Sequence, residues 1–170
     1  MSSGLMKDSN LMKEGDYIVV FTDPSTQIMI RLEANGIYNH KFGEFKHSNF
    51  IGAKYGKKVY STKSHGFVYC LKPDRVLFTQ NQKHRTQILY AIDISMTINF
   101  LNIKPGSIVV ESGTGSGSMS YSISKAIGDS GHLYTFEHNQ ERAEEAAKDF
   151  KNANRHNITV TQRDAYNDGF

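Results

Sequence analysis

The sequence has little cysteine and no long apolar run. Cys70 is the only cysteine among 170 residues, so an internal disulfide is excluded, and a reducing cytosol or nucleus is the expected compartment. No apolar stretch is long enough for a transmembrane helix or a signal-peptide core, so we expect no membrane segment, and no metal site is expected. Hydrophobic residues still make up 38% of the chain, which is enough for a core and argues against a disordered protein.

The net charge of +3 is small but unevenly distributed. Residues 41–75 carry eight Lys or Arg against two acids, a local charge of +6. Aromatic side chains are interleaved with these cations: Phe42, Phe45, Phe50, Tyr55, Tyr60, Phe67 and Tyr69. Cations that neutralise phosphates beside rings that stack on bases are typical of nucleic-acid-binding surfaces. The alternative is a β-barrel with the aromatic rings in its core and solvated lysines outside, and the two interpretations are compatible.

Hydrophobic periodicity divides the chain into parts. We expect a tail over residues 1–13, a small barrel-like all-β domain over 14–73, a linker over 74–87 and an α/β domain over 88–170. In the first domain, strands are expected at 17–21, 28–32, 58–60 and 66–71. In the second, a helix is expected from about 87 to 100, strands at 108–111, 132–137 and 157–161, and helices between the strands. Strands alternating with helices indicate a Rossmann-like parallel sheet.

A glycine-alternating turn follows the strand at 108–111. Gly113, Gly115 and Gly117 would let the backbone approach a ligand closely, although many tight strand-to-helix turns need glycine for conformation alone. Glu137, at the end of the next strand, can accept hydrogen bonds from ribose hydroxyls or, alternatively, cap the following helix. Asp164 occupies the corresponding position one unit later.

The residues around this turn favour one cofactor. The dinucleotide fingerprint is G-x-G-x-x-G, whereas here Glu111 precedes the first glycine and no pyrophosphate-binding basic residue follows. An acid repels phosphate but can hold an ammonium group, which favours S-adenosyl-L-methionine over NAD. We expect Glu111 and the loop N–H groups to hold the methionine moiety, Glu137 the ribose and Asp164 the adenine amino group.

Six segments together resemble one family. They span residues 42–47, 66–69, 84–90, 111–118, 132–137 and 140–143, and the similarity extends from about Glu14 to the last residue, Phe170. In this order they closely resemble the catalytic subunits of eukaryotic tRNA (adenine-58-N1)-methyltransferases. The resemblance implies a class I methyltransferase fold and transfer of a methyl group from S-adenosyl-L-methionine to N1 of an adenine in the tRNA T-loop. It also implies a heterotetramer with a related non-catalytic subunit, two copies of each, in the nucleus, with the cytoplasm as the second possibility.

The resemblance also assigns residues to roles. The cofactor pocket would be lined by Gln87, Leu89, Ser116, Gly117, Ser118, Glu137, Arg142 and Asp164. RNA would be contacted by His40, Lys41, Phe42, Gly43, Lys46, His47, His84 and Arg85. Two alternatives stay open: residues 84–87 as an ordinary interdomain linker, and Arg142 as a solvated residue paired with Glu145.

One departure from the family concerns catalysis. In the family a carboxylate after the fourth strand acts on the adenine, but this chain stops at Phe170, after the expected third strand. The expected catalytic Asp would therefore lie beyond Phe170, the catalytic residue is unknown, and we expect the chain to be inactive alone. Two rival functions are a protein isoaspartyl methyltransferase and a non-catalytic tRNA-binding subunit. The basic β domain argues against the first, and the intact glycine turn with Glu111 and Glu137 argues against the second.

Overall fold

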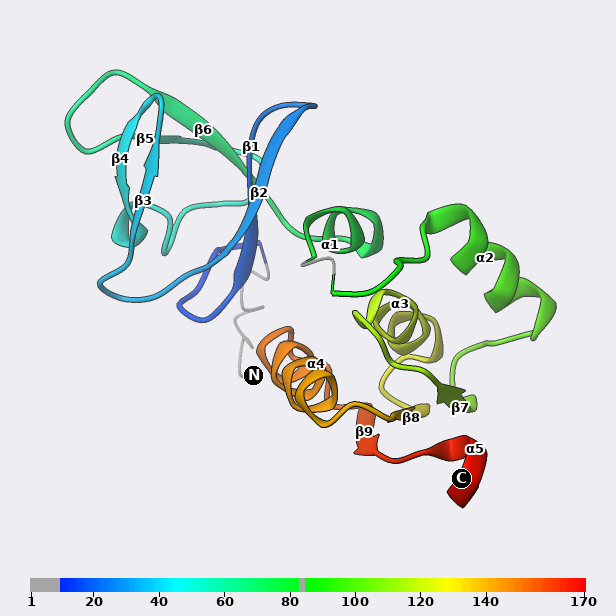
Figure 1. The fold of residues 1–170 in the computed structure, drawn as a ribbon. Coiled ribbons are helices and arrows are strands. Elements are labelled where there is room, and N and C mark those ends of the chain that lie inside the picture. Colours follow the sequence, from blue (N-terminus) through cyan, green and yellow to red (C-terminus); the bar gives the residue numbers. More distant parts are fainter. Residues whose placement is uncertain (1–9, 83–84) are drawn as a thin grey trace, which may run out of the picture. The chain divides into compact units, whose positions relative to one another are not determined.

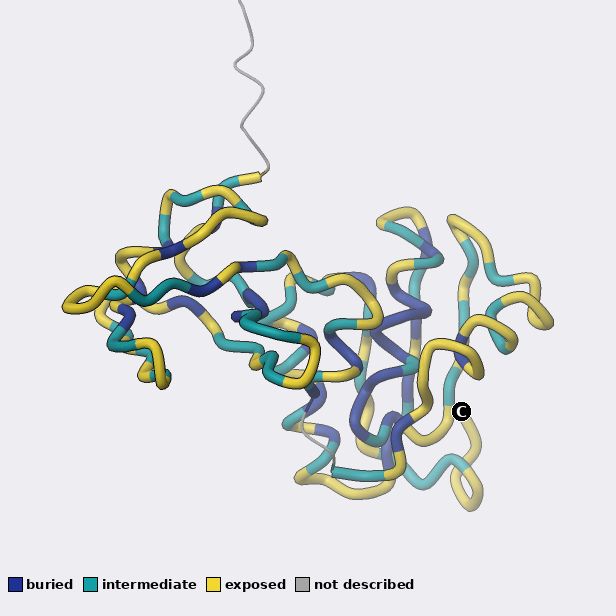
Figure 2. Tube along the Cα trace, turned by 90° about the horizontal axis from the view of Figure 1, so that it is seen from above, coloured by how far each residue is buried: buried dark blue, intermediate teal, exposed yellow. Residues whose placement is uncertain are grey.

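The computed structural model describes residues 10–82 and 85–170. It divides between Pro73 and Asp74 into two compact units, which are described separately (Figure 1). Each unit has its own buried residues, drawn dark blue in Figure 2.

The first unit is built from antiparallel strands. Its elements are β1 (Tyr17–Asp23), β2 (Thr26–Arg31), β3 (Ile37–His40), β4 (Gly43–Lys46), a short 3-10 helix (His47–Asn49), β5 (Lys58–Tyr60) and β6 (Phe67–Leu71). Strands β2, β1, β6 and β5 form a four-stranded sheet in that order, and β3 pairs only with β4. Among the described residues no strand ladder joins the two, so the expected barrel-like all-β domain consists of a four-stranded sheet and a hairpin.

The core of the first unit follows from strand alternation. Inward-facing residues of β1, β5 and β6 gather with residues of the turns in one cluster: Met12, Ile18, Val20, Leu32, Phe45, Phe50, Val59, Val68 and Cys70. Burial raises the pKa of the Cys70 thiol to about 12, so this thiol stays protonated at neutral pH. Two of the aromatic residues in the basic segment, Phe45 and Phe50, thus belong to the core.

Two expectations for the first unit are wrong. The tail was expected to extend to residue 13, but Leu11 pairs with Lys54, and Met12 is 1% exposed with its N–H donating to the Ala53 carbonyl at 2.9 Å. Residues 1–9 lie outside the described part of the chain. Strands were expected only at 17–21, 28–32, 58–60 and 66–71, so the β3–β4 hairpin was missed, because its short strands contain Gly, Asn, His and Lys.

The second unit alternates helices and strands. Its elements are α1 (Arg75–Asn81), α2 (Ala91–Phe100), β7 (Ile108–Ser112), α3 (Ser118–Ile127), β8 (His132–Glu137), α4 (Gln140–Asn152), β9 (Ile158–Gln162) and α5 (Ala165–Asp168). Strands β7, β8 and β9 form a parallel sheet in sequence order, as the alternation predicts. Their carboxyl ends therefore meet at one edge, where β7 and β8 lead into helices α3 and α4 (Figure 1).

One face of this sheet carries the core of the second unit. Val109 and Leu133 pack with Ile123 and Ile127 of α3, while Ile108 on the opposite face is 66% exposed. Helix α2, which was expected from about 87 to 100, also exposes apolar side chains. Ile92, Met96 and Phe100 are 76%, 51% and 77% exposed.

The expected linker at 74–87 is wrong over most of its length. Asp74 caps helix α1 by accepting a hydrogen bond from the Leu77 N–H at 2.8 Å. The Phe78 ring stacks on the Tyr121 ring of α3, with 3.8 Å between centroids. A buried aromatic contact with a helix about forty residues further along the chain makes this segment part of the second unit, and the local polar composition concealed it.

Candidate functional site

The loop between β7 and α3 has a backbone that requires glycine. Gly113, Gly115 and Gly117 have φ angles of +90°, +54° and +83°, in the left-handed region that side chains rarely adopt. A Cβ on Gly115 would lie 2.8 Å from the Thr86 hydroxyl, and one on Gly117 would lie 2.7 Å from the Phe150 ring. Conformation and space together exclude larger residues at both positions.

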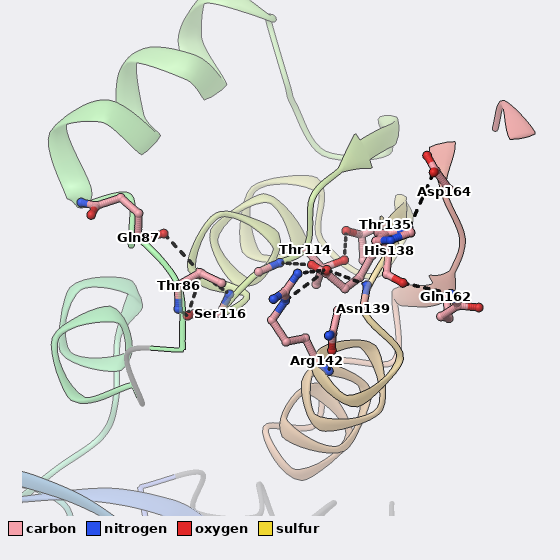
Figure 3. Close-up of polar contacts among 12 residues, drawn as sticks. Thr86, Gln87, Thr114, Ser116, Thr135, His138, Asn139, Arg142, Gln162 and Asp164 are labelled. Atoms are coloured by element: carbon pink, nitrogen blue, oxygen red, sulfur yellow. Dashed lines mark hydrogen bonds and ion pairs between the residues drawn. The ribbon is translucent and has the colours of Figure 1, made fainter. Parts of the chain in front are cut away.

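The Glu137 carboxylate lies directly against this loop at the end of β8. Its Oε2 accepts a hydrogen bond from the Gly115 N–H at 2.9 Å, and its Oε1 accepts from the Asn139 N–H at 3.0 Å. The guanidinium of Arg142 donates to the same Oε1 from Nη2 at 2.7 Å (Figure 3). Burial favours a higher pKa for Glu137, but the hydrogen bonds from Arg142, Asn139 and Gly115 outweigh it and hold the pKa below its ordinary value. Glu137 is therefore an ionised carboxylate at neutral pH.

The backbone N–H groups of the loop have partners within the protein. Those of Gly113 and Thr114 donate to the Phe136 carbonyl, Gly115 to Glu137, Ser116 to the Thr86 hydroxyl and Gly117 to the Thr114 carbonyl. The expectation that free loop N–H groups hold a ligand is thus corrected. The glycines instead provide a surface without Cβ atoms, which a ligand can approach closely.

The segment before α2 is hydrogen-bonded to the opposite side of the glycine loop. The Ser116 hydroxyl accepts from the Thr86 N–H at 3.1 Å, while the Ser116 N–H donates to the Thr86 hydroxyl at 3.1 Å (Figure 3). The Gln82 side-chain amide donates to the Ser116 carbonyl, and the Ser118 hydroxyl donates to the Leu89 carbonyl at 2.7 Å. These bonds make residues 85–89 a fixed wall facing the glycine loop.

A cavity of about 350 Å³ lies between this wall, the loop and β8. Its volume is in the range of small-molecule sites, about 300–1,000 Å³. Its lining consists of Thr86, Gln87, Ile88, Leu89, Gly113, Thr114, Gly115, Ser116, Gly117, Ser118, Met119, Glu137 and Arg142. The structure thus brings together every sequence-predicted cofactor residue except Glu111 and Asp164. Thr86 was missed, although it lies in one of the six recognised segments and carries a hydroxyl.

Comparison with known proteins identifies the family. The family described as tRNA methyltransferase complex GCD14 subunit matches residues 66–170, which is more than half of the chain. The chain belongs to the GCD14 family. The similarity to relatives also covers the first unit, because a tRNA (adenine(58)-N(1))-methyltransferase catalytic subunit of Dictyostelium discoideum is 44% identical over 162 residues, 95% of this chain and 52% of that protein. The corresponding catalytic subunit of Candida albicans is 40% identical over 161 residues, covering 95% of this chain and 48% of that protein.

Solved structures agree with the fold. A tRNA (m1A58) methyltransferase from Aquifex aeolicus matches with a TM-score of 0.73 and 26% identity over 94% of this chain and 61% of that chain. A SAM-dependent O-methyltransferase from Thermotoga maritima matches with a TM-score of 0.81 and 23% identity, covering 95% of this chain and 61% of that chain, and supports the fold alone. The class I methyltransferase fold expected from the sequence is confirmed, and the chain spans about half the length of the curated relatives it matches.

In this GCD14 family chain, Glu111 lies outside the cavity lining. Its Oε2 accepts hydrogen bonds from the hydroxyls of Thr135 at 2.7 Å and Ser120 at 2.5 Å, and the Thr135 hydroxyl also lies 2.7 Å from that of Thr114. Burial raises the pKa of Glu111, and the two hydroxyl hydrogen bonds only partly offset it. Glu111 thus supports the loop from β7, and its expected contact with a methionine moiety stays a prediction.

Asp164 also lies outside the cavity lining. Its Oδ1 accepts from the N–H groups of Tyr166 at 3.1 Å and Asn167 at 3.2 Å, as the cap of α5, and its Oδ2 lies 3.8 Å from His138 Nδ1 (Figure 3). Hydrogen bonds from Asn167, then from Tyr166, lower the pKa of Asp164 despite some desolvation. The structure therefore shows a helix cap where an adenine ligand was expected.

Phe170, the residue beyond which the catalytic carboxylate was expected, does not line the cavity either. Its side chain is 70% exposed, and its ring meets the Phe136 ring of β8 edge to face, with 5.5 Å between centroids. The location of the catalytic carboxylate beyond Phe170 stays a prediction.

The two arginines near the site have different partners from those expected. Arg142 pairs with Glu137 and lines the cavity, so the alternative of a solvated Arg142 paired with Glu145 is wrong. Glu145 instead lies 2.6 Å from Arg85 Nε, and Asp149 lies 2.9 Å from Arg85 Nη2. With its side chain only 15% exposed and held by two carboxylates of α4, Arg85 is a structural ion-pair residue rather than an RNA contact.

The other residues expected to contact RNA lie at the β3–β4 hairpin, apart from His84, which is outside the described residues. Lys41, Phe42 and Lys46 are exposed, His40 and Gly43 are half-buried, and His47 is 7% exposed. The His47 ring lies below the surface and its Nδ1 accepts a hydrogen bond from the Glu33 N–H at 3.0 Å. The expectation that His47 contacts RNA is thus corrected, while the turn itself remains an open surface.

The described residues contain neither a metal-ligand cluster nor a membrane-spanning helix. Within residues 10–82 and 85–170, no group of three or more His, Cys, Asp or Glu side chains is arranged to hold a metal ion. No helix in this part of the chain is long and apolar enough to cross a membrane.

Proposed function

We propose that this chain is the cofactor-binding part of a tRNA (adenine(58)-N(1))-methyltransferase catalytic subunit and that its cavity binds S-adenosyl-L-methionine. The observation that carries the proposal is the cavity bounded by the glycine loop, Glu137 and the wall at residues 85–89. The names of the relatives from Dictyostelium and Candida support the reaction, and the Aquifex structure supports the fold that performs it.

The residues of the cavity fit this cofactor better than a dinucleotide. The loop N–H groups are already bonded, so they do not form the cradle of free donors that a pyrophosphate needs. Arg142, the cation in the lining, is neutralised by Glu137. A carboxylate with a remaining lone pair, beside a surface without Cβ atoms, suits a ligand with hydroxyl groups.

Each element of the cavity has a distinct task. Glu137 Oε2 accepts one hydrogen bond from Gly115 and keeps a lone pair for a ribose hydroxyl, while Arg142 and Asn139 fix the orientation of the carboxylate. The glycine loop and the wall formed by Gln87 and Leu89 enclose the ligand from two sides. When bound, S-adenosyl-L-methionine supplies an electrophilic methyl group. This half of the site therefore binds and orients the donor.

The acceptor is proposed to be N1 of adenine 58 in tRNA. That atom is buried when the base is paired, so the base has to leave its stack at a cost of a few kcal/mol before it can reach the donor. The local charge of +6 over residues 41–75 supports binding to a polyanion of this kind. The family description names a complex, and a non-catalytic partner subunit, the two-plus-two assembly and the nuclear location are parts of the same proposal.

A two-stage experiment tests the function. Titration calorimetry should show saturable binding of S-adenosyl-L-methionine to the full-length protein, and the protein with its partner subunit should transfer a radioactive methyl group to a tRNA transcript carrying adenine 58. A transcript with guanine at that position is the matched control and should stay unlabelled. Absence of saturable cofactor binding, or equal labelling of both transcripts, would contradict the proposal.

A further inference from the structure

An aromatic surface lies on the outer face of the β5–β6 hairpin. The antiparallel register places Lys58 opposite Tyr69 and Tyr60 opposite Phe67. Strand alternation sends Val59 and its neighbours into the core and these four side chains to the other face. We name this surface, formed by Lys58, Tyr60, Phe67 and Tyr69, the β5–β6 aromatic face.

Its rings lie close together; the two tyrosines are exposed and Phe67 is half-buried. The Phe67 centroid lies 6.0 Å from that of Tyr60 and 5.7 Å from that of Tyr69. Tyr60 is 58% exposed and Tyr69 is 36% exposed. The Lys58 ammonium lies 3.9 Å from the Phe67 centroid and 5.9 Å from that of Tyr69. A cation is therefore held over adjacent rings at the surface.

The β5–β6 aromatic face continues into the β3–β4 turn. The Ser64 hydroxyl, in the loop between β5 and β6, donates to the Phe42 carbonyl at 2.8 Å, and the Thr62 N–H donates to the Glu44 carbonyl at 2.8 Å. Phe42 is 42% exposed and its ring lies 4.9 Å from that of His40. The two hairpins thus present exposed rings beside exposed lysines from the same end of the first unit.

Charge and composition favour an RNA ligand for this surface. Lys58 lies over the rings, Lys57 and Lys63 in the flanking segments are exposed, with Lys63 3.9 Å from Glu44, and the segment 41–75 has a charge of +6. The antiparallel register places three aromatic residues and a lysine on this face. Stacking rings next to ammonium groups match unpaired bases next to phosphates.

We propose that the β5–β6 aromatic face stacks unpaired bases of an RNA strand while Lys58 leaves the rings to neutralise a phosphate. The proposal rests on the proposed function in that the RNA is part of the tRNA substrate. It adds a second contact surface to the β3–β4 turn, and its chemistry selects single-stranded over paired RNA, because only unpaired bases offer their faces to rings on a sheet.

The test measures RNA binding by the full-length protein without cofactor. Fluorescence anisotropy with a labelled short oligouridylate is compared with the same measurement on an RNA duplex, for Tyr60→Leu, Phe67→Leu and Tyr69→Leu. Each leucine variant should bind the oligouridylate roughly 5- to 150-fold more weakly with an unchanged salt dependence, because stacking and not charge is lost. Tyr60→Phe keeps the ring and should retain affinity. Lys58→Ala should instead reduce the slope of log affinity against log salt by about 0.7, and Lys13→Ala is the control lysine of the same unit.

The outcomes separate this inference from the proposed function. Thermal unfolding and cofactor binding of the variants should match the unmodified protein, since the substituted side chains are at the surface. Leucine variants that bind oligouridylate within twofold of the unmodified protein overturn the inference, even if tRNA is methylated. If those variants also fail to associate with the partner subunit in light scattering, the face belongs to a protein interface instead. If the unmodified protein binds neither tRNA nor oligouridylate, the proposed function itself fails.

Discussion

The two loops that carry the functional residues use their polar groups in opposite ways. In the glycine loop of the second unit, the N–H groups of residues 113–117 are bonded within the protein, and Glu137 is paired with Arg142. In the β3–β4 turn of the first unit, Lys41 and Phe42 are exposed, and the Lys41 ammonium lies 5.3 Å from the Phe42 ring.

This difference indicates how each region recognises its ligand. The glycine loop is preorganised, so its ligand meets a fixed surface with one remaining acceptor position and loses little binding energy to rearrangement. The β3–β4 turn keeps exposed side chains in water, where they can contact the backbone of a polyanion. Substitutions in the glycine loop should therefore have an all-or-none effect on ligand binding, whereas substitutions in the β3–β4 turn should weaken ligand binding gradually.

The largest effect is expected for Gly115→Val. A side chain at this position is strained at a φ of +54° and would lie against the Thr86 hydroxyl, so the loop has to move away from Glu137. Titration calorimetry should show at least about 100-fold weaker binding of S-adenosyl-L-methionine, since strain and clash together exceed about 3 kcal/mol. Gly56→Val is the matched control, because Gly56 has a φ of +78° but open space around its Cβ direction. Affinity within threefold of the unmodified protein would show that the loop is not preorganised.

Glu137→Gln should have the next largest effect. The glutamine side-chain amide has one oxygen, so it cannot accept hydrogen bonds from all the present donors to Glu137. The Arg142 guanidinium is also left without its carboxylate partner. We expect cofactor binding to weaken about 10- to 100-fold, which corresponds to about 1.5–3 kcal/mol for a charged hydrogen bond. Glu141→Gln, in the exposed first turn of helix α4, controls for the charge change. Equal affinities of the two variants would remove Glu137 from the site.

Arg85→Ala distinguishes a structural arginine from an RNA contact. The variant leaves Glu145 and Asp149 without their shared partner and loosens the wall of the cavity. Chemical denaturation should show a loss of about 1–3 kcal/mol in unfolding free energy. The salt dependence of tRNA binding should stay unchanged. A reduced salt slope with full stability would restore the expectation that Arg85 contacts RNA.

Lys41→Ala should show the opposite pattern. Its ammonium is exposed on the β3–β4 turn, so its removal should leave the unfolding free energy unchanged. Filter binding across a salt series should give a few-fold weaker tRNA affinity and a slope lower by about 0.7–0.9. A stable protein with an unchanged slope would mean that the turn does not contact RNA.

The smallest effect is expected in the pH dependence of stability, where the two buried carboxylates should act with opposite signs. Glu137 has a lowered pKa in the folded state, so its stabilisation is present above the unfolded-state pKa and is lost as pH falls through the folded pKa. Glu111 has a raised pKa, so ionisation destabilises the fold as pH rises from the unfolded-state pKa through the folded one. Urea titrations should be run across the acidic range. As pH rises from the unfolded-state pKa of Glu111 through its folded-state pKa, Glu111→Gln should lose less unfolding free energy than the unmodified protein. As pH falls through the folded-state pKa of Glu137, Glu137→Gln should lose less unfolding free energy than the unmodified protein. The same sign for both variants would contradict the assignment.

Local patterns in the sequence predicted most of the second unit. The alternation of strands and helices and the glycine turn follow from short-range rules, and the structure contains both. Helix α1 was missed because its polar composition outweighed the cap at Asp74, whereas its stability comes from Phe78 stacking on a helix distant in sequence.

The remaining differences arise from long-range contacts. Arg85 looks like an exposed cation until α4 brings Glu145 and Asp149 to it, and Thr86 gains significance only through Ser116. Glu111 was expected to face a ligand, but its orientation is set by the hydroxyls of Ser120 and Thr135. Sequence patterns indicate which residues can take part in a site, while the direction of each side chain depends on partners that only the fold supplies.

The hydrogen bond between the Gly115 N–H and Glu137 has a spectroscopic consequence. Glycine-rich loops ordinarily exchange their amide protons with water rapidly, yet here the amides of residues 113–117 all have acceptors. The Gly115 amide is bound to a charged acceptor, and its resonance should therefore lie well apart from those of other glycines. Because a ligand hydroxyl on the same carboxylate would draw charge from this bond, that single resonance reports occupancy of the cavity, even when no reaction takes place.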